Sequence, residues 1–212
     1  MKPISRTLSI SLLAIASALA AACSPKATQA DHAQLVSTEV KPALWPVIES
    51  ALEQTGQTTV YDPAYRNLAY PGGDLPIERG VCADVIVRAF RRGGVDLQKE
   101  VHEDMARDFA AYPNRWGLKA PDSNIDHRRV PNLMTYFKRR GKALPITESA
   151  KDYEPGDVVA WDLGGGLTHI GIVVNRRARD GERYYIVHNI GAGARLEDVL
   201  FNWRQIGHYR FF

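Results

Sequence analysis

The chain has 212 residues, of which 45% are hydrophobic and 24% are charged, an ordinary composition for a globular protein. This composition excludes a disordered, collagen-like or coiled-coil chain, and the length is enough for one domain with a sizeable core. The formal net charge is +3, and the leader residues Lys2 and Arg6 account for most of it, so we expect no nucleic-acid partner. The two cysteines, Cys23 and Cys82, are too few for a disulfide framework.

The first 22 residues have the pattern of an export signal. Two basic residues and an apolar run from Leu8 to Ala22 precede Cys23. The run is shorter than the roughly 20 residues that a membrane-spanning helix needs. Small residues before a cysteine resemble a bacterial lipoprotein signal, in which Cys23 is lipidated; cleavage after an Ala-x-Ala site is the alternative. Ser24, which stands where an Asp would favour retention in the inner membrane, indicates a periplasmic lipoprotein anchored in the outer membrane.

These features predict a signal peptide over 1–22, a lipidated N-terminus and tether over 23–38, and one domain over 39–212. The first half of that domain is expected to be helical, with helices ended or restarted by Pro and Gly. The predicted helices are Lys41–Gln54, Cys82–Arg92, Asp96–Ala111 and Val130–Arg140. Tyr65–Gly80, rich in Gly and Pro, is predicted to be a loop.

The second half of the domain changes to β-rich runs separated by Gly clusters and a charged turn. The predicted strands are Asp157–Leu163, Thr168–Asn175, Arg183–Asn189 and Ile206–Phe211, after a short β-prone piece at Thr58–Tyr61. Helices first and strands second predict an α+β fold, with helices packed on one side of an antiparallel sheet.

Cys82 is the first candidate for chemistry. It begins a predicted helix and lies on the same apolar stripe as Val85, Ile86 and Ala89, so it points toward whatever the helix packs on. In a first turn, free backbone N–H groups and the helix dipole are expected to lower the pKa of a thiol. The alternative is a small buried hydrophobic residue without a chemical role.

His169 and His188 lie on two predicted strands that are joined by the charged turn. If this hairpin is symmetric, His169 faces His188 directly with Cβ atoms roughly 5 Å apart, and Gly171 on the same face leaves room for a helix end. A cysteine, a histidine and a polar partner form a nucleophile–base–orienter set. We therefore predict Cys82 as nucleophile, His169 as base and His188 as orienter; the alternative is two ordinary strand histidines.

Five motifs follow one another between Tyr61 and Phe212. They are Tyr70-Pro71-Gly72-Gly73, Gly80-Val81-Cys82, Pro155-Gly156-Asp157, His169-Ile170-Gly171-Ile172 and His188. Their order and spacing resemble those of the papain-like cell-wall cysteine peptidases, the NlpC-type superfamily. More narrowly, Gly80–Asp104, Asn124–Asn132, Trp161-Asp162 and His188-Asn189-Ile190-Gly191 resemble a bacterial periplasmic family catalogued as domain of unknown function 1287 (DUF1287).

The resemblance implies a papain-like α+β fold and a cysteine peptidase or amidase that hydrolyses amide bonds in peptidoglycan stem peptides. The Cys82 backbone N–H would then stabilise the oxyanion. The expected partners are peptidoglycan or a peptide, and the membrane through the lipid; a monomer without cofactor is expected. One alternative is a metal-dependent hydrolase that uses the histidines. Another is an inactive cell-wall-binding lipoprotein, because Val81 and Ala83-Asp84 differ from the usual Asp before and Ser-Gly after the cysteine.

Candidate substrate contacts come from the loops and strand ends around these motifs. They are Tyr70, Asp84, His127, Arg128, Arg129, Trp161, Asp162 and Asn189. Arg128 and Arg129 suit substrate carboxylates, although a solvated or capping turn is an equal alternative. No metal site is predicted, because His102-Glu103-Asp104 has no second histidine at the spacing that a helical metal motif requires.

Overall fold

The structure is a computed structural model that describes residues 40–212. The predicted signal peptide, the lipidation site at Cys23 and the tether lie outside the described residues. Among residues 40–212, no helix combines the length and apolar character needed to cross a membrane.

The helical half follows the predicted order. The helices and 3-10 turns are η1 (Pro42–Leu44), α2 (Trp45–Gln57), α3 (Cys82–Arg92), α4 (Leu97–Arg107), η2 (Phe109–Ala111), η3 (Asp126–Arg128), α5 (Val130–Arg139) and η4 (Ala150–Asp152). The Asp96 side chain caps α4 by accepting the Gln98 N–H at 3.1 Å. This helix ends four residues earlier than predicted because Asp108 leaves the helical conformation, and a separate short turn, η2, follows.

The strands form one five-stranded antiparallel sheet and one small parallel pair. The strands are β1 (Val60–Tyr61), β2 (Arg79–Gly80), β3 (Val158–Gly164), β4 (Leu167–Arg177), β5 (Tyr184–Asn189), β6 (Ala194–Glu197) and β7 (Arg204–Tyr209). The order in the large sheet is β6-β5-β4-β3-β7, and β1 pairs with β2 separately. The edge strand β6, next to β5, was not predicted from the sequence.

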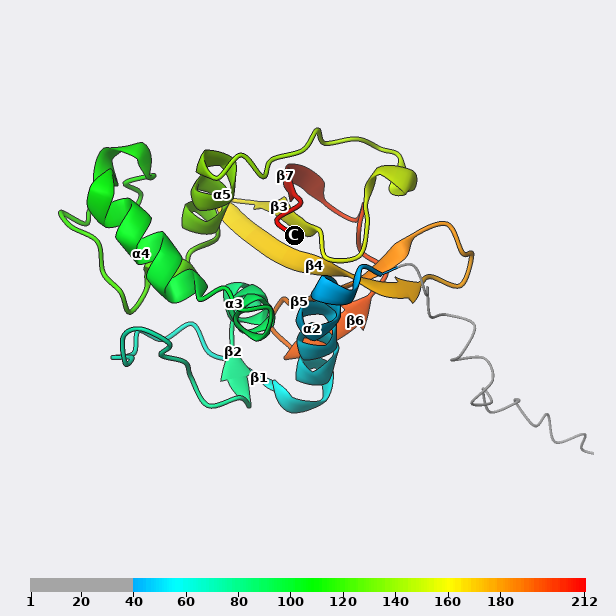
Figure 1. Ribbon diagram of the computed structural model, residues 1–212, viewed down its shortest axis with the longest axis horizontal. Coiled ribbons are helices and arrows are strands. Elements are labelled where there is room, and N and C mark those ends of the chain that lie inside the picture. Colours follow the sequence, from blue (N-terminus) through cyan, green and yellow to red (C-terminus); the bar gives the residue numbers. More distant parts are fainter. Residues whose placement is uncertain (1–39) are drawn as a thin grey trace, which may run out of the picture.

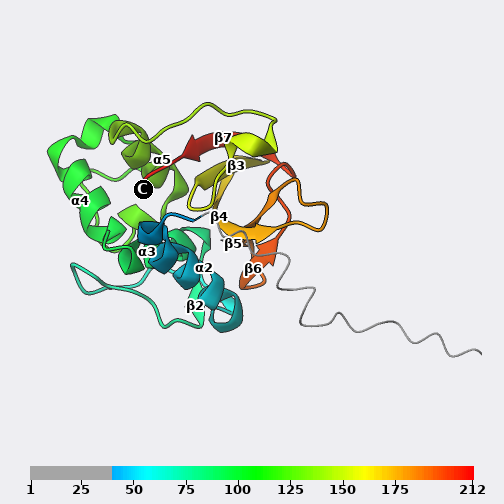
Figure 2. The same cartoon turned by 45° about the vertical axis from the view of Figure 1, so that its right-hand side comes forward.

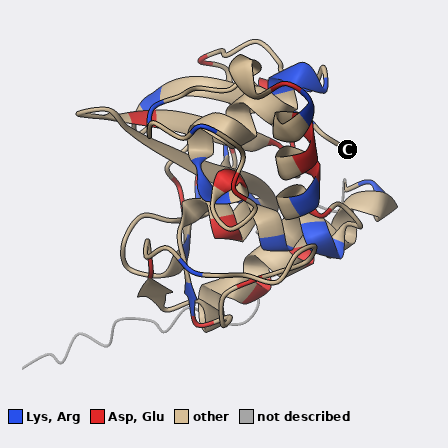
Figure 3. Cartoon of the chain, turned by 90° about the vertical axis from the view of Figure 1, so that its left-hand side faces the viewer, with Lys and Arg blue, Asp and Glu red and all other residues tan. Residues whose placement is uncertain are grey.

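Helices α2, α3 and α5 cover one face of the large sheet, as Figures 1 and 2 show. The main core lies between them and includes the inward-facing Ile170 and Ile172 of β4. A second, smaller core lies on the opposite face around Trp161 and Ile186, where Leu200 of the β6–β7 connection packs. The prediction of an α+β fold with helices on one side of an antiparallel sheet is confirmed. Basic and acidic positions are interspersed over the helical end of the molecule (Figure 3).

The predicted register of the β4–β5 hairpin is wrong by two residues. Gly171, not His169, lies opposite His188, and Arg177 pairs with Tyr184 next to the turn. The turn is centred further along the chain than a symmetric hairpin requires, and an irregularity after Val173 corrects only part of that offset. Because the net shift is even, both histidines stay on one face of the sheet.

Candidate active site

The start of α3 is held by a buried ion pair. The Asp84 carboxylate accepts the Val81 N–H at 2.7 Å, which caps the first turn. It also receives two bonds of 3.0 Å from the Arg128 guanidinium, and both side chains are almost fully buried. Arg128 donates further to the backbone oxygens of Asp62 and Ala64. Cys82, the first residue of α3, is therefore set on a rigid base.

Cys82 reaches the sheet where β4 and β5 separate. The last pair of these strands is Gly171 with His188. Beyond it the Ile170 N–H bonds to the Cys82 thiol, and the Asn189 side-chain amide donates to the Gly80 oxygen at 3.0 Å. The thiol therefore lies against the backbone of the residue after His169, and the residue two before Cys82 is tied to the end of β5.

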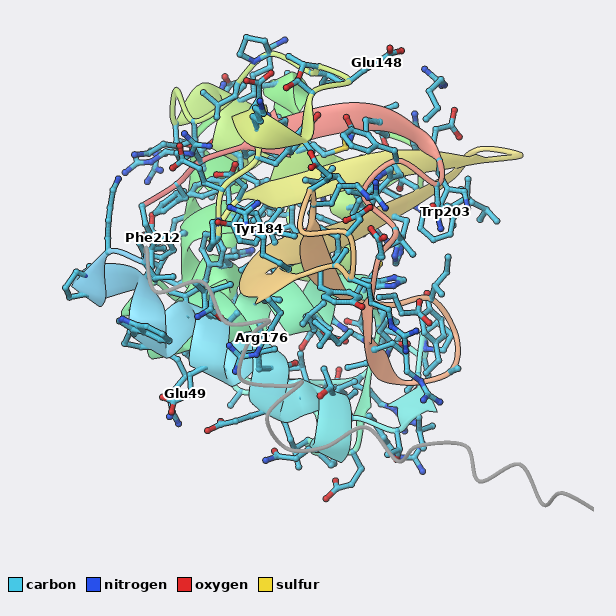
Figure 4. All side chains as sticks on the ribbon, turned by 90° about the vertical axis from the view of Figure 1, so that its right-hand side faces the viewer. Glu49, Glu148, Arg176, Tyr184, Trp203 and Phe212 are labelled. Carbon is cyan, nitrogen blue, oxygen red and sulfur yellow. The ribbon has the colours of Figure 1, made fainter. Side chains whose placement is uncertain are left out.

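The two histidines are in direct contact. His169 Nε2 lies 2.8 Å from His188 Nδ1. The Trp161 ring stacks on His169, with ring centroids 5.7 Å apart, and Trp203 meets both imidazoles edge-on. Trp203, labelled in Figure 4, belongs to the segment between β6 and β7. These aromatic rings enclose the histidine pair and shield it from water.

Gly171 makes room for this pair rather than for a helix end as predicted. A Cβ at Gly171 would lie 2.6 Å from Ile186 Cγ2, 3.1 Å from His188 Cβ and 3.2 Å from Trp161 Cζ3. The helices pack on the other face of the sheet, against Ile170 and its neighbours. The glycine therefore permits the close approach of His188 and Trp161 on the face that carries the histidines.

Glu197 also belongs to the site, although it was not predicted from the sequence. Its Oε2 lies 2.8 Å from His188 Nε2, so both ring nitrogens of His188 have partners. The sequence does contain a pattern that could have indicated it: Ala194–Glu197 follows β5 after a glycine-rich turn, and such a turn is typical of a hairpin, which these segments form.

Tyr61 was also missed, and it lies near the thiol. It pairs with Gly80, two residues before Cys82. Its pKa is raised by burial, and next by the proximity of Cys82 and Asp84. Nothing in the sequence places Tyr61 there, because the parallel pairing of β1 with β2 joins segments about twenty residues apart.

The protonation state of the site differs from the prediction. Burial raises the pKa of the Cys82 thiol to about 12, and this outweighs the lowering by the Ile170 N–H and by the N–H groups of the first helical turn. Burial, aided by the neighbouring His188, lowers the pKa of His169 to about 3. The effect of desolvation on the pKa of both groups therefore outweighs the stabilisation of a thiolate by the start of α3. At neutral pH the resting pair is a neutral thiol and a neutral imidazole.

Three of the predicted substrate contacts are enclosed within the protein, which corrects the prediction for them. Asp84 and Arg128 saturate each other, so the Arg128 guanidinium cannot bind a substrate carboxylate. The alternative for Arg128, a place in a solvated or capping turn, does not describe this buried guanidinium either. His127 is 1% exposed, and burial lowers its pKa to about 4. The sequence did not indicate that these charged or polar residues are buried, because their burial depends on partners that are distant in the chain.

The remaining predicted contacts lie in different places. Trp161 packs under His169 and donates its indole N–H to the Leu200 oxygen at 3.0 Å. Asn189 braces the strand before Cys82, and Asp162 binds Arg204 and caps the β3–β4 turn. The Arg129 guanidinium stacks 4.1 Å over the Trp116 ring. Tyr70 contacts the His102 ring and Glu103 on α4.

Within residues 40–212, no three His, Cys, Asp or Glu side chains gather as metal ligands. His102 binds Asp126, with its Nδ1 3.1 Å from Asp126 Oδ2. His208 binds the buried Asp157, with its Nε2 2.8 Å from Asp157 Oδ2. The metal-dependent alternative therefore has no ligand cluster in the described part of the chain.

The fold and site define an α+β protein in which a cysteine at a helix start lies against the strand that carries one of two contacting histidines. The chain belongs to the family described as Domain of unknown function (DUF1287), whose model matches residues 48–211. This confirms the narrower resemblance found in the sequence.

A relative and a solved structure were also found in the other comparisons. The chain is 60% identical over 166 residues to a protein of Escherichia coli (strain K12) named "Uncharacterized protein YijF", covering 78% of this chain and 80% of that one. A solved structure from Staphylococcus aureus subsp. aureus Mu50, described as similar to lipoprotein of the NLP/P60 family, is 13% identical with a TM-score of 0.41. That match covers 82% of this chain but 43% of the other, so the chain spans less than half of that structure.

Proposed function

We propose that this protein is a cysteine hydrolase, an amidase or endopeptidase, that cleaves amide bonds in peptidoglycan stem peptides. The observation that carries the proposal is the position of the Cys82 thiol. It lies in the first turn of α3, against the backbone next to His169, which in turn contacts His188. A nucleophile, a base and an orienting group in this order are the requirements of acyl transfer through a covalent intermediate.

In the first half of the reaction, His169 Nδ1 accepts the thiol proton while Cys82 Sγ bonds to the carbonyl carbon of the amide. Backbone N–H groups of the first helical turn, including that of Cys82, stabilise the oxyanion. The C–N bond then breaks, and the proton on His169 moves to the leaving amine nitrogen. The acyl group stays on sulfur as a thioester.

In the second half, His169 accepts a proton from water while the water oxygen attacks the thioester carbon. The C–S bond breaks, the acid product leaves, and the sulfur regains the proton from His169. The raised pKa of Cys82 means that the proton transfer accompanies attack rather than precedes it. The thiol proton leaves on the amine and water supplies its replacement, so one cycle restores the thiol and the imidazole without a cofactor.

For substrate recognition, we propose Arg129 as the contact for a substrate carboxylate. The support is its planar guanidinium, which belongs to a partly buried residue and is held in place by stacking on Trp116. Arg128, its neighbour, is committed to Asp84 and serves instead to hold the start of α3. Arg129→Ala should raise the KM for peptides with a free carboxylate and leave that for amidated peptides unchanged; an equal effect on both would contradict this role.

We also propose that the protein is exported, anchored in the outer membrane by a lipid on Cys23, and monomeric in the periplasm. The support is the leader sequence, with its basic start, apolar run and small residues before Cys23. Substitution of Cys23 by alanine should move the protein from the membrane to the soluble fraction, and retention in the membrane would contradict the anchor.

The experiment that tests the proposed hydrolysis is incubation of purified peptidoglycan with the protein, followed by mass spectrometry of the released fragments. Cys82→Ala and His169→Ala should release nothing while keeping the wild-type circular dichroism spectrum. His102→Ala is the matched control, because His102 is a histidine that binds Asp126 and lies on α4, outside the site. Full release by Cys82→Ala, or none by the folded wild type, would overturn the proposal; the latter would indicate a non-catalytic wall-binding protein.

A further inference from the structure

Glu197 completes a row of polar side chains that crosses three neighbouring strands. His169 lies on β4, His188 on β5 and Glu197 on β6. His188 pairs with Gly171 on one side and with Arg195 on the other. His169 lies two residues from Gly171, and Glu197 lies two residues from Arg195. Both are therefore diagonal neighbours of His188, and long side chains can span such a diagonal. The two resulting links, His169 to His188 and His188 to Glu197, both measure 2.8 Å.

The links determine which ring nitrogens carry protons. An ionised carboxylate can only accept a hydrogen bond, so His188 Nε2–H donates to Glu197. A neutral imidazole has one N–H, which leaves His188 Nδ1 bare and able to accept from His169 Nε2–H. The same rule then leaves His169 Nδ1 without a proton. Both rings are neutral at neutral pH, because burial lowers the pKa of each.

We propose that Glu197 is a positioning residue that holds the two histidines in the tautomers that leave His169 Nδ1 free to accept a proton. The inference rests on the proposed function, in which Cys82 gives its proton to that nitrogen. Without the carboxylate, His188 carries its proton equally well on Nδ1. The relay then reverses, His169 is protonated on Nδ1, and that ring no longer accepts a proton from the thiol.

The environment of Glu197 separates this role from a purely structural one. The Glu197 side chain is 46% exposed at the edge of the sheet, whereas that of His188 is fully buried. A leucine at this position keeps the strand propensity and buries no new polar group, so the fold should survive. The property removed is the acceptor at His188 Nε2. Glu182→Leu is the matched control, because Glu182 is an exposed glutamate at the turn of the neighbouring hairpin.

The decisive measurement is the nitrogen NMR spectrum of the histidine rings in protein labelled with ¹⁵N-histidine. In the wild type and in Glu182→Leu, we expect both His169 and His188 as the Nε2–H tautomer. In Glu197→Leu, we expect a second population with His169 protonated on Nδ1. A wild-type His169 protonated on Nδ1, or ring spectra unchanged by Glu197→Leu, would overturn the proposal.

Kinetics provide the second measurement. At metal sites, loss of the outer partner of a histidine lowers metal affinity or activity roughly ten- to hundredfold, and we expect an effect of the same order for this imidazole. We expect this loss in the kcat of Glu197→Leu, with KM unchanged because the residue does not contact the substrate. An unchanged kcat would overturn the role of Glu197 in an active hydrolase. Because the ring spectra do not depend on turnover, failure of the proposed hydrolysis would be seen separately, as inactivity of the wild type.

Discussion

Replacement of Asp84 by alanine tests whether the buried ion pair holds the helix start that carries Cys82. The Arg128 side chain is 2% exposed and would lose its anion. Breaking a buried ion pair from one side costs about 3–5 kcal/mol, and loss of a helix cap costs about 1 kcal/mol. Arg128 would keep two backbone acceptors, the oxygens of Asp62 and Ala64. We therefore expect the free energy of unfolding to fall by about 4 kcal/mol.

The assay is urea unfolding at neutral pH, followed by circular dichroism. Asp108→Ala is the matched control, because Asp108 pairs with Arg139 on the surface and should lose less than about 1 kcal/mol. The double variant Asp84→Ala/Arg128→Met should lose less than the sum of the single losses. If Asp84→Ala does not fold, Asp84→Asn removes the charge but keeps an acceptor for the Val81 N–H. A loss for Asp84→Ala no larger than that for Asp108→Ala would refute the argument.

Two further predictions concern the site. Because burial holds the pKa of Cys82 at about 12, thiolate absorbance measured against Cys82→Ser should appear only above about pH 10. The raised pKa stabilises the fold below the ordinary thiol pKa of about 8.5, and this contribution is lost as the pH rises towards 12; thiolate at neutral pH would contradict the neutral resting pair. Gly171→Ala places a Cβ against Ile186 and His188 and should cost about 1–3 kcal/mol in urea unfolding, with loss of hydrolysis. Gly56→Ala, in open space near the end of α2, should change stability by less than about 1 kcal/mol, and equal stabilities of the two glycine variants would contradict the crowding.

Local patterns predicted much of the fold. The apolar stripe from Cys82 to Phe90 and the following glycines predicted α3 with its observed bounds, because helix periodicity and a C-terminal glycine are both local signals. The strands β3, β4 and β5 were found from their β-branched residues. The four-residue β6 was missed because three of its residues are exposed, so no buried alternation marks it.

The site was harder to predict because its properties depend on tertiary packing. The two histidines were placed on the correct face and in contact, but in the wrong strand register, since the register depends on where the turn closes and on the irregularity after Val173. The direction of the thiol pKa shift was wrong because the helix start is a local feature, whereas desolvation of Cys82 depends on the elements packed around it. In the sequence, Arg128 has the features of a surface residue. Its burial is explained by the ion pair with Asp84, which is distant in the chain.

The position of Glu197 on an edge strand links the site to local opening of the fold. The strand β6 has four residues, pairs with β5 on one side, and is tied to the end of α2 by the Ala194 N–H, which donates to the Thr58 oxygen at 2.8 Å. Short edge segments open at a lower free energy than the whole domain unfolds. A molecule with β6 detached would keep Cys82, His169 and His188 in place but lose the carboxylate. In the proposed hydrolase, the fraction of molecules able to react would then depend on the opening equilibrium of this strand. Hydrogen exchange of the β6 amides measures that equilibrium.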